Sequence, residues 1–260
     1  MRHILGALRR CDEQFNLIKD GDNIAVAVSG GKDSIALLNA MQLYRHFSKQ
    51  KFGLKAVSVD LGQKGFFDSA PIAELCDKWN IEYDVVETNI ASVVFEGRRE
   101  KNPCSLCSKM RRGTIHDWCK RNNCNKVALG HHREDALETF MMSFLFEGRI
   151  STLSPITWMD RSDIEQIRPL LFCPESEIIN AIKKYKLPIT KSKCPVDGKT
   201  NRQTMKELIK SFGDIATDPE KYMLLALRKT DNYNLWDTNK RRPDDMPPWH
   251  NPFGSPENLK

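Results

Sequence analysis

Residues 24–34 contain the stretch that decides the fold: Ile24-Ala25-Val26-Ala27-Val28-Ser29-Gly30-Gly31-Lys32-Asp33-Ser34. The run that ends at Val28 is small and apolar, as in a strand that is covered on both faces. Apolar side chains then recur at helical spacing over residues 34–46. Glycines between such a strand and helix let backbone N–H groups approach an anion, and the helix dipole favours negative charge at the same point. The stretch therefore predicts a phosphate-binding turn and not merely a glycine turn.

The polar side chains of residues 29–34 suit the same ligand. Lys32 adds a positive charge, and the hydroxyls of Ser29 and Ser34 can donate to phosphate oxygens. The run is shorter than the Gly-x4-Gly-Lys-Ser/Thr loop that grips β- and γ-phosphates. We therefore expect Ser29 to Ser34 to bind the pyrophosphate part of a nucleotide.

Strand and helix patterns alternate along the rest of the chain. Strands are expected at 54–61, 83–87 and 126–129, and an edge-like strand with a proline at 166–170; helices are expected to open at 69–71 and 174, and to cover about 104–121 and 134–146. Such alternation predicts the α/β class, with a parallel sheet and helices on both faces. Polar clusters at 29–34, 60–66 and 130–135 follow three of the strands. Ligands bind at the carboxyl ends of such strands, so these clusters mark the expected site.

Composition places the chain among soluble proteins of the cytoplasm. It has 260 residues, a net charge of +6, no membrane-length apolar run and no signal-peptide pattern at its start. Residues 183–210 hold nine basic residues and two acidic ones. This excess suits a phosphate-rich polymer, although a solvated basic face has the same composition.

Cys104 and Cys107 form a C-x-x-C pair, which the basic residues Lys109, Arg111 and Arg112 follow. The pair can belong to a zinc site, a redox pair or an iron–sulfur cluster. A zinc site requires four ligands, and the sequence has no second C-x-x-C. A third cysteine, Cys194, lies inside the basic segment. The spacing alone does not separate zinc from iron.

Several runs together resemble the tRNA 2-thiocytidine synthetase family, a branch of the PP-loop ATP pyrophosphatases, over about residues 8–212. They are Phe15-Asn16-Leu17-Ile18 with Gly21-Asp22, the loop at 29–34, residues 60–64, 104–113 and 128–135, and Ile167-Arg168-Pro169-Leu170. The resemblance implies ATP and Mg²⁺ as cofactors. It also implies a [4Fe-4S] cluster on Cys104, Cys107 and Cys194. The chain departs from the family at Asp197, where the family commonly has a second cysteine. Asp197 is therefore an alternative ligand.

The resemblance also implies roles for individual residues. Gly130 and His131 are expected at the nucleotide, with Asp135 as a catalytic residue. Two further catalytic residues are expected from position and charge: Asp60, which ends a strand beside the loop, as a magnesium or ribose contact, and Arg111 as a cation for the charge that develops on phosphate. Each has a plainer alternative: Asp60 as a strand-end cap, Asp135 as the acid of a helix N-terminus, and Arg111 as a contact to tRNA phosphate.

The implied reaction is the ATP-dependent adenylation of the C2 carbonyl of cytidine 32 in tRNA, followed by replacement of oxygen with sulfur. The implied partners are tRNA, a sulfur donor such as a cysteine desulfurase or free sulfide, and, by analogy with the family, a second copy of the chain. No membrane is expected. The alternatives are thiolation of uridine or of a small molecule, and a zinc-stabilised RNA-binding module without catalysis. We expect a PP-loop catalytic domain at 1–200 with an inserted cysteine loop, a helical extension at 201–230 and a proline-rich tail at 231–260.

Overall fold

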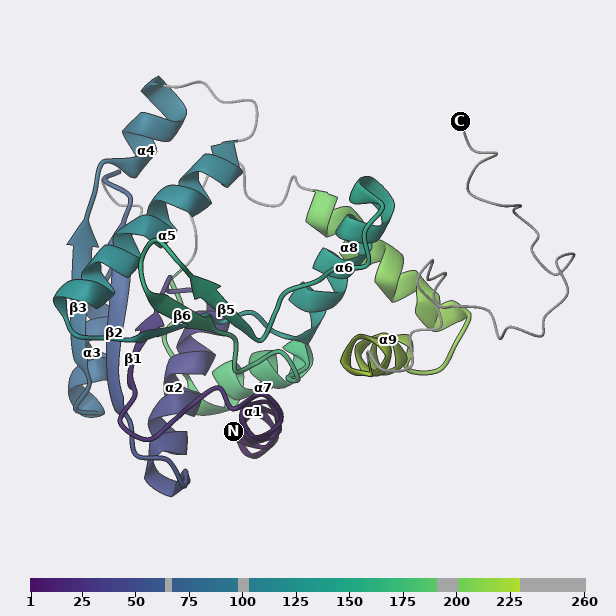
Figure 1. Cartoon of the computed structure of the whole chain (residues 1–260), viewed down its shortest axis with the longest axis horizontal. Coiled ribbons are helices and arrows are strands. Elements are labelled where there is room, and N and C mark those ends of the chain that lie inside the picture. The colour runs from purple at the N-terminus through teal and green to yellow at the C-terminus, as the bar shows by residue number, and fades with distance from the viewer. Residues whose placement is uncertain (64–66, 98–102, 191–200, 230–260) are drawn as a thin grey trace, which may run out of the picture. The chain divides into compact units, whose positions relative to one another are not determined.

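The apolar run that precedes the phosphate-binding turn forms the central strand of a six-stranded sheet (Figure 1). The computed structural model describes residues 1–63, 67–97, 103–190 and 201–229. The strands are β1 (Asn23–Ala27), β2 (Gly53–Asp60), β3 (Glu82–Glu87), β4 (Lys126–Ala128), β5 (Ile156–Met159) and β6 (Ile164–Ile167). Their order in the sheet is β3-β2-β1-β4-β6-β5, and β1 pairs in parallel with both β2 and β4. The chain therefore reverses its direction of travel across the sheet beside β1, which is where ligands bind in such folds.

Helices connect the strands and continue after them. They are α1 (Arg2–Phe15), α2 (Lys32–Phe47), α3 (Ala70–Lys78), α4 (Ile90–Ser92), the π-helical turn η1 (Val93–Gly97), α5 (Pro103–Arg121), α6 (Arg133–Glu147), α7 (Glu175–Tyr185), α8 (Asn201–Ser211), the 3₁₀ turn η2 (Phe212–Asp214) and α9 (Pro219–Arg228). The predicted helices are confirmed, and α1 was not predicted.

The two faces of the sheet are buried to different extents. Ile24 and Val26 of β1 face a large core that also contains side chains of α1, α2, α3 and α7. Ala25, between them in the sequence, faces a small core that α5 closes with Trp118 and Cys119. This alternation is the two-residue period of a strand. The indole Nε1 of Trp118 donates to Asp84 Oδ2 at 2.9 Å, which fixes α5 against β3.

The expectation of an edge strand at 166–170 was wrong. The strand there is β6, which ends at Ile167 and lies between β4 and β5. Pro169 lies beyond the strand and interrupts no pairing. The edge belongs instead to β5, which pairs antiparallel with β6, so the sheet is mostly but not wholly parallel.

The chain divides into two compact units, Met1–Leu224 and Leu225–Lys260. The first contains the sheet and all of the site described below. Among the described residues, no helix has the length and apolar character that a membrane crossing needs. The predicted proline-rich tail at 231–260 lies outside the described residues.

Candidate functional site

A cavity of about 410 Å³ opens where β1, β2 and β4 end. The turn after β1 contributes Ser29, Asp33 and Ser34, and the turn after β4 contributes Gly130, His131 and Asp135. Helix α5 closes another side with a row of residues, and Gln166 of β6 and Arg202 of α8 complete the lining. Two of the three polar clusters expected at the carboxyl ends of the strands therefore line one cavity.

The phosphate-binding turn is held in shape by its own serines. Ser34 Oγ accepts the backbone N–H of Ser29 at 3.2 Å and donates to the carbonyl of Gly31 at 2.9 Å. Gly30 has φ +82°, and a Cβ there would lie 3.0 Å from Cβ of Thr190. Thr190 in turn donates its backbone N–H to the Gly30 carbonyl at 2.8 Å. Glycine is needed at position 30 for both its conformation and its space.

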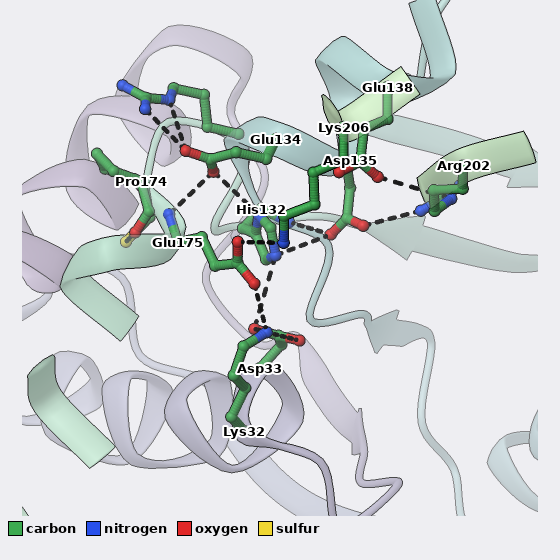
Figure 2. A network of polar contacts seen from close by, with 12 residues as sticks. Lys32, Asp33, His132, Glu134, Asp135, Glu138, Pro174, Glu175, Arg202 and Lys206 are labelled. Carbon is green, nitrogen blue, oxygen red and sulfur yellow. Dashed lines mark hydrogen bonds and ion pairs between the residues drawn. The ribbon is translucent and has the colours of Figure 1, made fainter. Parts of the chain in front are cut away.

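Lys32 does not line the cavity, because two carboxylates hold its ammonium group at the side (Figure 2). Its Nζ lies 2.9 Å from Asp33 Oδ1 and 2.9 Å from Glu175 Oε1. Burial lowers the pKa of Lys32, but the two carboxylates outweigh burial and leave that pKa above its ordinary value. The positive charge of Lys32, which we expected at the phosphates, therefore lies beside the cavity and is already paired with two carboxylates.

Gly130 lets the turn after β4 approach the first turn of α2. A Cβ at this position would lie 3.0 Å from the carbonyl carbon of Asp33 and 3.0 Å from the backbone nitrogen of Ser34. Both are backbone atoms, which cannot move aside without shifting the phosphate-binding turn. A side chain here is excluded, and the two turns can share one ligand.

The two histidines after Gly130 have opposite environments. Burial lowers the pKa of His131 to about 4, so its imidazole is neutral, and its Nδ1 is buried with no partner in the described part of the chain. Burial also acts against charge on His132, but a hydrogen bond to Glu134 and the nearby carboxylates of Asp135 and Asp33 raise its pKa. His131 lines the cavity, whereas His132 lies behind it in a set of ion pairs.

Those ion pairs connect α2, α6, α7 and α8 (Figure 2). Asp135 accepts the backbone N–H of His132 at 2.9 Å and the Arg202 guanidinium at 2.8 Å. Glu175 joins Lys32 to Lys206, whose Nζ lies 2.7 Å from Glu175 Oε2. Burial opposes ionisation of Glu134, but His132 and Arg133 hold its pKa at about 2. We call this set the ion-pair wall: Lys32, Asp33, His132, Glu134, Asp135, Glu175, Arg202 and Lys206.

Helix α5 forms the opposite side of the cavity, which we call the α5 wall: Ser108, Arg111, Arg112, Ile115 and His116. Arg111 is half-buried and Arg112 is exposed. Within the described residues neither guanidinium forms an ion pair with a carboxylate.

Polar groups form the floor between β6 and α5. Gln166 is 2% exposed and His116 is 5% exposed. The amide nitrogen of Gln166 lies 2.8 Å from His116 Nε2, and Ser162 Oγ lies 3.0 Å from His116 Nδ1. Burial and the charge of Arg112 lower the pKa of His116, which keeps the ring neutral.

The remaining predicted residues lie outside the lining. Asp60 Oδ1 accepts the N–H of Gly62 at 2.9 Å, as a strand-end cap does. Cys104 is exposed and Cys107 is half-buried in the first turns of α5, inside the helix and not in a loop before it. Ser108, next to Cys107, lines the cavity. Cys194 and Asp197 lie outside the described residues, and no group of three metal-binding side chains occurs among the described ones.

The site residues that were missed in the sequence include His116, Gln166, Glu175 and Arg202. Each reaches its partner across the chain; Arg202 and Asp135, for example, are 67 positions apart. Only the basic composition around Arg202 pointed to that residue, and it gave no partner.

Comparison with known proteins places this geometry in context. A family model described as a PP-loop domain matches residues 7–211. The tRNA-cytidine(32) 2-sulfurtransferase of Geobacter metallireducens is 34% identical over 249 residues, which cover 95% of this chain and 96% of that protein. The protein of the same name from Colwellia psychrerythraea is 34% identical over 87% of this chain and 72% of its own length.

A solved structure shares the fold. It is the U34-tRNA thiolase NcsA from Methanococcus maripaludis with its [4Fe-4S] cluster. The TM-score is 0.70 at 21% identity, over 86% of this chain and 77% of that one. The likeness establishes the arrangement of the sheet and its helices.

Proposed function

Since the chain belongs to the PP-loop domain family and, within it, to the family of the tRNA-cytidine(32) 2-sulfurtransferases, we propose that it thiolates cytidine 32 of tRNA with the use of ATP. One observation carries the proposal. A single cavity joins the phosphate-binding turn to the α5 wall, and the Cys104–Cys107 pair lies at the start of that same helix. This arrangement supports a reaction in which nucleotide and sulfur chemistry take place at one site.

The turn at 29–34 binds the phosphates of ATP. The free N–H groups at the start of α2 and the hydroxyls of Ser29 and Ser34 face the cavity or border it. Such groups bind anions without needing a further charge. Lys32 can bind the phosphates after an exchange of partners, because a phosphate can replace Glu175 or Asp33 at its Nζ.

Asp135 and Arg111 act on opposite sides of the reacting groups. The cytidine C2 oxygen attacks the α-phosphorus of ATP, the bond to the bridging oxygen breaks, and pyrophosphate leaves. Asp135 is the carboxylate that can hold Mg²⁺, which neutralises phosphate charge when bound. Arg111 stabilises the negative charge that develops on the phosphate. Asp60, which lies beside the cavity, serves as a second carboxylate for the metal or as a ribose contact.

The cysteines suit a thiolate-bound cluster. Cys104 and Cys107 are three positions apart on α5, so their sulfurs project from the same face of the helix. Cys194 is the third ligand of the proposal, and described residues on both sides of it reach the site, Thr190 at Gly30 and Arg202 at Asp135. When bound by these three cysteines, a [4Fe-4S] cluster would provide an iron without a protein ligand, at which the sulfur for the transfer could bind.

The basic segment suits tRNA as the partner. Lys183, Lys184 and Lys186 before residues 191–200 and Lys210 after them are exposed and can contact tRNA phosphates. The target base must leave its stack to reach the cavity, which a loop nucleotide does at low cost. We propose a cysteine desulfurase or free sulfide as sulfur donor, a cytoplasmic location and a homodimer. The proposed division is a catalytic domain at 1–200, a helical extension at 201–230 and a tail at 231–260.

Anaerobic reconstitution tests the proposal. Purified protein with ATP, Mg²⁺, sulfide and a tRNA transcript is expected to form 2-thiocytidine and to release pyrophosphate. It should contain about four irons and about four sulfides per chain. The Cys107→Ser variant should lose iron and activity. The control is Cys173→Ala, which changes a buried thiol two residues before α7 and should keep both. Stoichiometric zinc without sulfide would contradict the cluster, and 2-thiouridine in place of 2-thiocytidine would contradict the substrate.

A further inference from the structure

The polar floor of the cavity contains a glutamine whose amide is fixed from both ends. Gln166 faces α5, because its neighbour Ile167 points into the large core on the other side of the sheet. It is 2% exposed, yet it lines the cavity. A buried amide that reaches a cavity can form hydrogen bonds with a ligand in that cavity.

The directions of the hydrogen bonds can be followed from one end of the floor. Ser162 donates its hydroxyl to the carbonyl of Met159 at 3.2 Å, so its oxygen is left to accept from His116 Nδ1. Neutral His116 then carries its proton on Nδ1 and accepts at Nε2. The group that donates to Nε2 at 2.8 Å is the amide N–H of Gln166.

The other end of the floor gives the same orientation. Arg168 is 8% exposed, and its Nη1 donates to the Ser154 carbonyl and to Thr157 Oγ1 at 2.6 and 2.9 Å. Its Nη2 lies 3.5 Å from Oε1 of Gln166. Turning the amide over would place its NH₂ group against the guanidinium and its oxygen against the lone pair of His116. Both contacts would be repulsive, so the amide is locked.

A locked amide retains one N–H and one oxygen lone pair, because a glutamine side chain has two of each. We propose that Gln166 is a specificity-determining residue that binds a base through an exocyclic amine and the unprotonated ring nitrogen next to it. Cytosine presents that edge as its N4 amine and N3, and adenine presents it as its N6 amine and N1 or N7. In the same orientation, uracil presents a carbonyl beside an N–H, and hypoxanthine presents a carbonyl beside N1–H or beside N7. The locked amide matches none of these patterns.

The inference rests on the proposed function for its bases, since tRNA cytidine and ATP are the two substrates. Apolar side chains of β1, β2 and β4 line the cavity around this floor, as a planar base requires. The experiment must therefore distinguish cytosine from adenine as the base that Gln166 contacts.

The test uses the full chain and the variants Gln166→Glu and Gln166→Met. One arm measures thiolation of two tRNA transcripts that differ only in cytidine or uridine at position 32. The second arm measures binding of ATP and ITP, which needs no thiolation. A carboxylate has no N–H to donate, so Gln166→Glu should lower one of the two preferences about tenfold or more. Gln166→Met, which keeps the length but has no polar atoms, should lower the same preference with no added charge.

Gln50→Glu is the matched control. Gln50 accepts from Ser48 through its Oε1, an acceptor that glutamate keeps, and it lies before β2 and away from the cavity. A lower cytidine-to-uridine ratio in the Gln166 variants assigns the contact to the tRNA base, and a lower ATP-to-ITP ratio assigns it to adenine. Unchanged ratios in folded Gln166→Met protein overturn the inference. A wild-type protein that makes no thiolated nucleoside would contradict the proposed function and leave the nucleotide arm to decide on Gln166.

Discussion

The ion-pair wall beside the cavity pairs its charges internally (Figure 2). The α5 wall instead presents Arg111 and Arg112 with no carboxylate partner among the described residues. On the first wall, Asp135 is held by Arg202 and Lys32 by Glu175. A ligand there must exchange with a partner that is already present. On the second wall, the negative charge has to come from the ligand itself. The first wall is thus suited to binding the nucleotide by exchange with partners that are already present, and the second wall is suited to attracting a polyanion.

The largest expected effect is that of Asp135→Asn on the ion-pair wall. Loss of the carboxylate removes the proposed metal ligand and leaves Arg202 without its closest partner. We expect kcat for thiolation to fall about 100-fold or more. The control is Glu138→Gln one turn along α6, because Glu138 lies 3.8 Å from the same Arg202 but outside the lining of the cavity. Equal activity of Asp135→Asn and wild type in a rate assay would contradict the role of Asp135.

The second prediction concerns the stability of the ion-pair wall against acid. The pKa of Glu134 is lowered from 4.5 to about 2, so its ionised form stabilises the fold above about pH 4.5, and this stabilisation is lost as the pH falls toward 2. The contribution at neutral pH is about 3 kcal/mol. Urea unfolding between about pH 3 and about pH 7 should show a shallower pH dependence for Glu134→Gln than for wild type. Glu13→Gln, at an exposed position on α1, should keep the wild-type dependence.

The third prediction concerns the α5 wall. Arg111→Met should lower kcat/KM for tRNA about tenfold, because the negative charge that develops on the phosphate loses its stabilising cation. The loss of one positive charge beside tRNA should also reduce the dependence of kcat/KM on salt. Arg111→Lys should restore part of the rate. Lys109→Met removes a charge from the same helix at an exposed position outside the lining. If the Lys109 and Arg111 variants lose activity equally, α5 attracts tRNA only through its general charge.

These contrasts also show what the sequence could and could not predict. The loop at 29–34, the turn at Gly130 and the cysteine pair are each contiguous, so local chemistry was enough to find them. Gln166 and His116 are 50 positions apart and meet only because β6 lies beside β4 under α5. No local pattern contains that contact.

The prediction of an edge strand at 166–170 failed for a related reason. Proline at 169 suggested an edge, but a neighbouring hairpin strand decides where the edge lies. Ile156-Thr157-Trp158-Met159, a polar turn and Ile164-Glu165-Gln166-Ile167 form a hairpin pattern that could have revealed β5.

The smallest expected effect is on the stability of α5. Gly113 lies inside this helix, and a Cβ there would meet nothing within 4 Å. Gly113→Ala should therefore stabilise the fold by about 1 kcal/mol in urea unfolding. Gly148→Ala is the contrasting control. Gly148 follows α6 and has φ +62°, so a side chain there should destabilise the fold. A destabilised Gly113→Ala protein would mean that α5 is not a regular helix at this point.

The most direct test of the central claim is nucleoside analysis of tRNA from a strain that lacks this gene. The account predicts that 2-thiocytidine disappears, that the wild-type gene restores it and that the Asp135→Asn gene does not. An unchanged level of 2-thiocytidine in the deletion strain would contradict it.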